Sequence, residues 1–131
     1  MHSMLFVNLP VADVDRSRKF FASLGYAINE QFSGDTAVTL VLADNQFAML
    51  LQRDDFDSLH PLETADATKV KECVVCLGVD SRDAVDTLVD QAIAASGTDG
   101  GDSEDHGSMY GRSYNDLDGH SWQIFWTDDA A

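Results

Sequence analysis

The chain has 131 residues, of which 44% are hydrophobic, enough for one compact domain with its own core. Its 23 acidic and 8 basic side chains give a formal net charge of −15, which excludes the basic face that binding to nucleic-acid phosphates requires. No stretch approaches the roughly 20 apolar residues of a membrane span, and the first residues lack the features of a signal peptide, so we expect a cytoplasmic protein with no membrane partner.

The acidic charge has two interpretations. A focused negative field attracts cationic ligands, whereas an acidic surface is also typical of an adaptation for solubility or for salt. Lysine is scarce, with Lys19, Lys69 and Lys71 only, and this favours the second interpretation.

The first half of the chain predicts one βαβββ unit. An apolar run over 5–9 leads to Asp13, a good N-cap, and the amphipathic segment that follows ends at Gly25. The inward face of this helix carries Val14, Phe20, Phe21 and Leu24. Three strand-like runs come next, over 26–32, 37–42 and 46–51, with a tight turn at Asp44-Asn45 between the last two.

The second half repeats this order after a polar connector in which 54–59 favour a short helix. A strand is predicted over 73–79, and the helix after it has an inward face of Val85, Leu88, Val89, Ala92 and Ile93. Residues 98–107 are rich in Gly and Asp and predict a mobile loop with at most a short strand. The last two strands, over 109–114 and 121–127, meet at a hairpin signal, Asp118-Gly119.

The two halves begin alike, because Val11 and Val79 each close an apolar strand just before an Asp that starts a helix, Asp13 and Asp80. A fixed internal spacing indicates a duplicated supersecondary unit. We therefore predict one α+β domain over 1–131, with module one at about 4–52, a connector at 53–70 and module two at 71–127. Two such modules generally enclose a groove, and function has to be argued from that groove rather than from the fold.

The two cysteines, Cys73 and Cys76, have the spacing of a CxxC redox pair. They lie in an apolar strand, however, where residues three apart point to opposite faces. Two reduced core thiols are therefore the favoured interpretation.

Three segments of the chain resemble the vicinal oxygen chelate superfamily, which includes glyoxalase I, the bleomycin-resistance proteins and the extradiol dioxygenases. They are VNLPVADVDRSRKFFASLGY at the start, VDSRDAVDTL at the second helix and MYGRSYNDLDGHSWQIFW at the end. The DxDGH turn before an aromatic strand is the most specific of them, and the small bacterial glyoxalase-like proteins are the most similar subgroup. The resemblance implies two paired βαβββ modules that form a U-shaped, mostly antiparallel sheet, with helices on the convex side and a ligand on the concave face.

Active members of this superfamily bind a divalent metal through four residues, one from each of four strands, and His and Glu suit such ions. Alignment with the family places these positions, with an uncertainty of one residue for the second, at Phe6, Met49, Val74 and Gln123. Two hydrophobic side chains, a thioether and an amide do not hold a hard divalent ion. We therefore predict no metal and no other cofactor in the groove, which argues against metal-dependent lyase, isomerase and dioxygenase chemistry.

Strand alternation predicts the rest of the groove, because Asn8, Cys76 and Phe125 share the faces of Phe6 and Gln123. Tyr110 and Arg112 are expected to flank it. A guanidinium at Arg112 suits a carboxylate or phosphate ligand, and an ion pair with Asp116 or Asp118 is an equal alternative. The predicted ligand-binding residues are Phe6, Asn8, Met49, Val74, Cys76, Tyr110, Arg112, Gln123 and Phe125.

No nucleophile–base pair in the sequence names a catalytic residue. Two main functions remain, besides a scaffold whose groove serves only in dimerisation. The first is a metal-free protein that binds a small aromatic or cationic molecule without turnover. The second is an enzyme, either a metal-dependent lyase or isomerase of the lactoylglutathione lyase type or a metal-independent enzyme on the same fold. Apolar surface left over from a single curved sheet predicts a homodimer.

Overall fold

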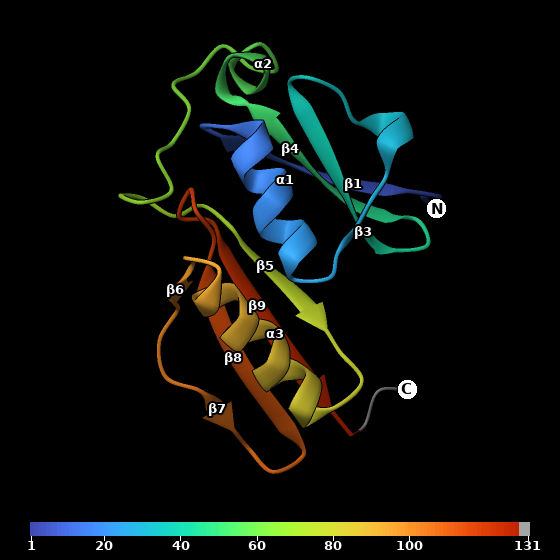
Figure 1. Cartoon of the computed structure of the whole chain (residues 1–131), viewed down its shortest axis with the longest axis vertical. Helices are drawn as coiled ribbons and strands as arrows, with labels where there is room; N and C mark the ends of the chain where they lie inside the picture. The colour runs from blue at the N-terminus through green and yellow to red at the C-terminus, as the bar shows by residue number, and fades with distance from the viewer. Residues whose placement is uncertain (129–131) are drawn as a thin grey trace. The chain divides into compact units, whose positions relative to one another are not determined.

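The structure is a computed structural model that describes residues 1–128 (Figure 1). The chain forms two compact units, Met1–Thr64 and a second unit from Ala65 onward, and each is described by itself. Each unit has an open mixed sheet with a helix on it, which confirms the predicted α+β class with tandem modules. Residues 53–64 of the predicted connector belong to the first unit. Within residues 1–128, no helix is both long and apolar enough to cross a membrane.

The first unit has a four-stranded sheet in the order β1-β4-β3-β2. Only β1 and β4 run parallel, while the other neighbours are antiparallel. Its elements are β1 (Leu5–Val11), α1 (Val14–Ser23), β2 (Ala27–Ile28), the 3₁₀ turn η1 (Glu30–Phe32), β3 (Ala37–Ala43), β4 (Gln46–Gln52) and α2 (Arg53–Asp57).

The ends of α1 follow the sequence signals. The main-chain N–H of Arg16 donates to Oδ1 of Asp13 at 3.1 Å, so Asp13 is the N-cap. Gly25 follows the helix with φ +93°, a conformation that glycine adopts without strain. The predicted inward face is confirmed, since Val14, Phe20, Phe21 and Leu24 are all buried.

The strand predicted over 26–32 is wrong beyond its first residues. Only Ala27–Ile28 pair with β3, and Asn29 then caps η1 by accepting the main-chain N–H of Phe32 on its side-chain oxygen at 3.3 Å. Ser33 donates its hydroxyl to the Asn29 carbonyl at 2.7 Å. Short polar side chains that bond to nearby main chain compete with a strand ladder, which explains the break.

The second unit has a five-stranded sheet in the order β5-β9-β8-β6, with β7 also paired to β8. β5 and β9 run parallel and the remaining pairs are antiparallel. The helix α3 packs on β8 and β9 and covers one face of the sheet (Figure 1). The elements are β5 (Val74–Gly78), α3 (Arg82–Ala94), β6 (Thr98–Asp99), β7 (Glu104–Asp105), β8 (Met109–Asn115) and β9 (Ser121–Thr127).

The second helix differs from the expectation at both ends. Its N-cap is Ser81 rather than Asp80, since the main-chain N–H of Ala84 donates to the Ser81 hydroxyl oxygen at 3.0 Å. Val85, Val89 and Ala92 are buried as predicted, but Ile93 in the last turn is 36% exposed. The Gly- and Asp-rich segment after the helix holds two short strands, β6 and β7, rather than one.

The prediction of core thiols is wrong, because Cys73 and Cys76 are both exposed and free. Cys73 precedes β5, while Cys76 lies in β5 on the same cross-strand row as Gln123 of β9. This row is on the face that α3 leaves uncovered.

The turn between β8 and β9 is organised by the buried Asp116. Its Oδ1 accepts the main-chain N–H groups of Asp118 at 2.9 Å and His120 at 3.0 Å, and its Oδ2 accepts the indole N–H of Trp122 at 2.9 Å. Burial raises the pKa of this carboxyl above its ordinary value. The DxDGH motif is thus a structural turn that fixes the start of β9.

Candidate ligand site on the second sheet

The uncovered face of the second sheet carries a hollow of about 210 Å³. Two cross-strand rows form its base. One row joins Cys76, Gln123 and Ser113, and the next joins Gly78, Phe125, Gly111 and Glu104. The first row is polar and the second is mainly apolar, which is the usual composition of a small-molecule pocket.

The apolar part of the hollow exists because β8 has a glycine at Gly111. A Cβ at this position would lie 3.7 Å from Cβ of Phe125 and 3.9 Å from Sδ of Met109, both of which line the same hollow. On the other side of β9, the Phe125 ring lies against Gly78, where a Cβ would approach Cζ to 3.2 Å. The ring therefore leans toward β5 and leaves the space above Gly111 open.

The polar part of the hollow has hydrogen-bonding groups in a defined orientation. The Cys76 thiol donates to Oε1 of Gln123 at 3.0 Å, which turns the Gln123 amide nitrogen to the other side. Across residues 1–128, neither that nitrogen nor the Ser113 hydroxyl has a protein partner. The Gln123 amide nitrogen is therefore available to a ligand.

Two carboxylates, those of Asp102 and Glu104, complete the lining at the β7 edge of the sheet. Glu104 pairs with Gly111, so its side chain is on the hollow side, while the next residue, Asp105, pairs with Tyr110 and faces α3. The imidazole of His106 lies beside Glu104, with Nε2 3.6 Å from Oε2. The carboxylates of Asp102 and Glu104 give this edge of the hollow its negative charge.

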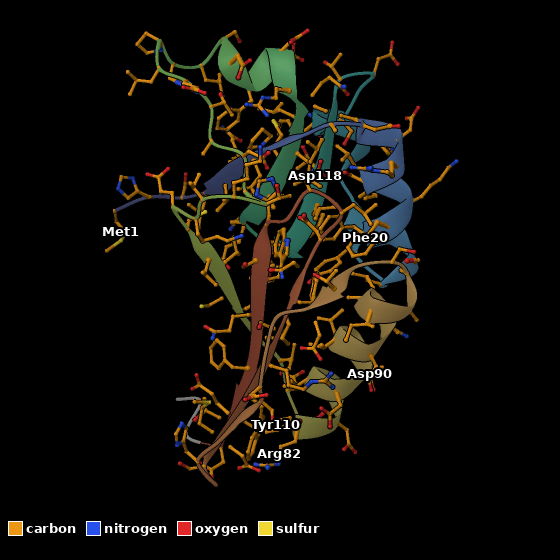
Figure 2. All side chains as sticks on the ribbon, turned by 90° about the vertical axis from the view of Figure 1, so that its left-hand side faces the viewer. Met1, Phe20, Arg82, Asp90, Tyr110 and Asp118 are labelled. Carbon is orange, nitrogen blue, oxygen red and sulfur yellow. The ribbon has the colours of Figure 1, made fainter. Side chains whose placement is uncertain are left out.

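Arg82, the first residue of α3, contacts this edge of the sheet from the helix side. Its guanidinium forms an ion pair with Asp105, donates to the Gly107 carbonyl at 3.3 Å and lies 4.6 Å above the Tyr110 ring (Figure 2). The main-chain N–H of Gly107 and the Arg82 guanidinium both bond to the Asp105 carboxylate and lower its pKa. The strand that carries Glu104 is thereby fixed to the helix.

The side chains of Tyr110 and Arg112 lie on the helix side of β8, which differs from their predicted place in the groove. Arg112 still borders the hollow, whereas Tyr110 is not among its lining residues. The Tyr110 hydroxyl donates to Asp86 at 2.6 Å, and the Arg112 guanidinium donates to Asp86 at 3.0 Å and Asp90 at 2.9 Å. The ion pairs expected with Asp116 or Asp118 are therefore replaced by pairs with α3.

These contacts also set the protonation of the cluster. The hydrogen bond from the Tyr110 hydroxyl lowers the pKa of Asp86, and Arg112 lowers it further. Partial desolvation raises this pKa but does not outweigh them. The same carboxylate raises the pKa of Tyr110. Desolvation alone would lower the pKa of Arg112, but its bonds to Asp86 and Asp90 outweigh this and raise it. Arg112 is a neutralised structural cation.

The predicted residues of the first unit lie on its own sheet. Asn8 is paired with Met49 and Phe6 with Phe47, so the four share the face opposite the Leu9–Leu50 pair. The Phe6 ring stacks on Phe47 at 4.8 Å and meets Phe32 of η1 edge-on at 5.5 Å. This face of the first sheet is thus partly occupied by its own aromatic side chains.

The residues at the family's metal positions do not fit a divalent ion. Phe6 is packed among phenyl rings, and Val74 is an aliphatic side chain that is 48% exposed. Gln123 offers an amide whose oxygen is already bonded to a thiol, and Met49 offers a soft thioether. Within residues 1–128, no three His, Cys, Asp or Glu side chains are grouped as a metal site.

Part of the predicted set is brought together here. Of the predicted ligand-binding residues, Cys76, Gln123 and Phe125 line the hollow, and Val74 lies beside them on the same face of β5. The residues that it missed are Asp102, Glu104, Met109, Gly111 and Ser113. A signal was present at Gly111, because a glycine inside a strand often marks a close approach of a ligand. Asp102 and Glu104 lie in a segment without hydrophobic periodicity, so the sequence contains no signal for them.

Comparisons with known proteins agree with this fold. Residues 3–40 match the family described as bleomycin resistance protein-like N-terminal. Curated protein sequences gave no match. A hypothetical protein from S. aureus is 27% identical, with a TM-score of 0.80 over 96% of this chain and 94% of that chain.

Two further solved structures have titles that name a function. A glyoxalase/bleomycin resistance protein/dioxygenase family enzyme from Burkholderia phytofirmans is 19% identical, with a TM-score of 0.77 over 93% of this chain and 96% of that chain. A lactoylglutathione lyase from Agrobacterium tumefaciens is 14% identical, with a TM-score of 0.67 over 96% and 94% of the two chains. These findings support the resemblance to the vicinal oxygen chelate superfamily: the chain has the fold of solved proteins whose titles name glyoxalase, bleomycin resistance or dioxygenase proteins, and its residues 3–40 match a bleomycin resistance protein-like N-terminal family.

Proposed function

We propose that this protein binds a small organic cation in the hollow of its second sheet, without a metal and without turnover. The observation that carries the proposal is the hollow itself, in which an apolar base of Phe125, Met109 and Gly111 is bordered by the carboxylates of Asp102 and Glu104. A ligand with an apolar body and a positive charge satisfies both parts of this lining.

The charge of the molecule supports a cation rather than an anion. The guanidinium nearest the hollow, Arg112, is turned away and bonded to two carboxylates, so it does not attract an anion. The net charge of −15 adds a long-range field that raises the local concentration of cations at the surface. An anionic substrate would meet repulsion from this field and from the carboxylates of Asp102 and Glu104 in the lining.

The lyase alternative gains no support from the side chains of the hollow. The enzyme from Agrobacterium tumefaciens shares the fold at 14% identity, and at this level only the fold is comparable. Gln123 occupies the place of the family's metal-binding Glu, and an amide is a weaker ligand for a hard ion than a carboxylate. We therefore favour binding without turnover over the lyase alternative.

Calorimetric titration with benzyltrimethylammonium tests this proposal, with benzyl alcohol and phenylacetate as neutral and anionic analogues. We expect saturable binding of the cation only, weakened by added salt. Glu104→Gln is expected to reduce the affinity about threefold to tenfold, and Asp128→Asn, a change at an exposed carboxylate outside the hollow, is the control. Equal binding of all three compounds, or an unchanged affinity in Glu104→Gln, would contradict the proposal.

A further inference from the structure

The two polar borders of the hollow differ in kind and lie apart on the sheet. Gln123 is on β9 and Glu104 on β7, with β8 between them, and their cross-strand rows are two residues apart. With strands about 4.8 Å apart and a rise of about 3.4 Å per residue, their Cα positions are separated by roughly 12 Å. A ligand that touches both is therefore extended across the strands.

The Gln123 end presents hydrogen-bond donors. Its amide oxygen already accepts the Cys76 thiol at 3.0 Å, so the amide N–H₂ group is the part of this lining side chain that is left for a ligand. Ser113 is paired with Gln123 in the same cross-strand row, but its hydroxyl lies against Gly100, where a Cβ would overlap it. The Gln123 amide N–H₂ group, which donates hydrogen bonds, suits a carbonyl oxygen on the ligand.

The carboxylates at the Glu104 end present hydrogen-bond acceptors. An ionised carboxylate cannot donate, and Asp102 beside it is a second carboxylate in the lining. The Asp105–Arg82 ion pair on the reverse side of β7 fixes the strand that carries Glu104, so this charge has a defined position. Between the two ends lie Phe125 and Gly111, which offer apolar contact and no polar group.

We propose, on the basis of the binding function above, that the ligand is a bifunctional amphiphile: a carbonyl that accepts from Gln123, an apolar spacer over Phe125, and an ammonium group at Glu104. Cys76 is a positioning residue in this arrangement, because its thiol sets which end of the Gln123 amide faces the ligand. N-acyl diaminoalkanes are the simplest compounds with this pattern. In N-acetyl-1,6-diaminohexane the two polar ends lie roughly 10 Å apart when the chain is extended, close to the separation on the sheet.

The test compares N-acetyl-1,6-diaminohexane with two compounds that each lack one end, hexylammonium and N-hexylacetamide. Titrations monitored by NMR are expected to give about tenfold weaker binding for each of the latter. N-acetyl-1,2-diaminoethane, which is too short to reach both ends, is expected to bind as weakly. Hexylammonium that binds as tightly as the bifunctional compound would overturn this inference while leaving the cation-binding function intact. If neither cation binds, the cation-binding function itself fails.

Variants separate the two ends of the site. Gln123→Met, similar in size, is expected to lower the affinity for the bifunctional compound about tenfold and to leave hexylammonium unchanged, whereas Glu104→Gln lowers both. Cys76→Ser keeps a donor to the amide and is expected to retain the affinity, while Cys76→Ala loses part of it. An equal effect of Gln123→Met on both compounds, or of Cys76→Ser and Cys76→Ala on the bifunctional compound, would contradict the proposed orientation.

Discussion

At the scale of single residues, Asp116 shows how one buried carboxylate determines a turn. It accepts three N–H groups, from Asp118, His120 and the Trp122 indole. An asparagine at this position has one acceptor and one donor group, so its amide N–H₂ would face at least one of these donors. The sequence identified this motif as a turn, because Asp, Asn and Gly have strong and specific turn chemistry.

Asp116→Asn is therefore expected to lower the free energy of unfolding by about 1–3 kcal/mol, the cost of leaving a buried donor without an acceptor. Denaturant unfolding monitored by tryptophan fluorescence measures this, since Trp122 is in the same network. Asp128→Asn, at an exposed carboxylate, is the control and should change stability by less than about 0.5 kcal/mol. A stability of Asp116→Asn equal to that of the control would show that the network contributes nothing.

Asp86 makes a pH-dependent contribution through its bonds to Tyr110 and Arg112. These bonds hold its pKa below the ordinary value of 3.8, so its contribution is complete above pH 3.8 and is lost as the pH falls through the lower folded-state pKa. Because Asp86 is 46% exposed on its side chain, solvent screening limits the contribution to about 1 kcal/mol or less.

Asp86→Asn should therefore be less stable than the wild type near neutral pH, and the difference should shrink below pH 3.8 as the wild-type carboxyl takes up a proton. Urea unfolding at a series of pH values measures it. A difference that stays constant down to pH 2, or one that grows in acid, would contradict the assigned ion pair.

At the scale of elements, the sequence predicted best where periodicity and capping agree. The helix after Asp13 has both signals and is present, and the hairpin predicted from the turn signal Asp118-Gly119 is present too. Residues 26–32 are apolar enough for a strand, but Asn29 diverts the chain into η1 through hydrogen bonds that no periodicity reveals. The same limit applies to the site, because the face of β8 on which Arg112 lies depends on the register of β8 against β9, which periodicity does not reveal either.

The strand glycines give a matched pair of tests for the hollow. Gly111→Ala places a methyl group at ordinary contact distance, 3.4 Å or more from its neighbours, inside the hollow. We expect unchanged or slightly raised stability together with at least about fivefold weaker binding of benzyltrimethylammonium, since the added methyl fills space that the ligand needs. Thermal unfolding and calorimetry on the same samples measure both effects.

Gly78→Ala is the comparison variant. Its methyl would lie 3.2 Å from Cζ of Phe125 and push the ring toward the hollow, so it too should weaken binding, but with a loss of stability. Full affinity in Gly111→Ala would show that the ligand does not contact the space above β8.

At the scale of the whole molecule, the duplication visible in the sequence corresponds to two units with the same order of strands, β1-β4-β3-β2 and β5-β9-β8-β6. The halves differ in how their uncovered faces are filled. Phenyl rings occupy the face of the first sheet, while the glycines of the second sheet leave a hollow. The order of elements in the sequence predicts the duplication. Whether the open face of each sheet is filled or hollow depends on single side chains, which the order of elements does not reveal. The candidate site was therefore only partly predictable.

The measurement that tests the central claim most directly is a thermal-shift titration of untagged, metal-stripped protein with benzyltrimethylammonium and, in parallel, with Ni²⁺, Zn²⁺, Mn²⁺ and Fe²⁺. A ligand that prefers the folded state raises the melting temperature by mass action. We predict a saturable rise with the organic cation and none with the metal ions. A rise with a stoichiometric metal and no response to the organic cation would contradict the proposed function and favour the metal-dependent enzyme.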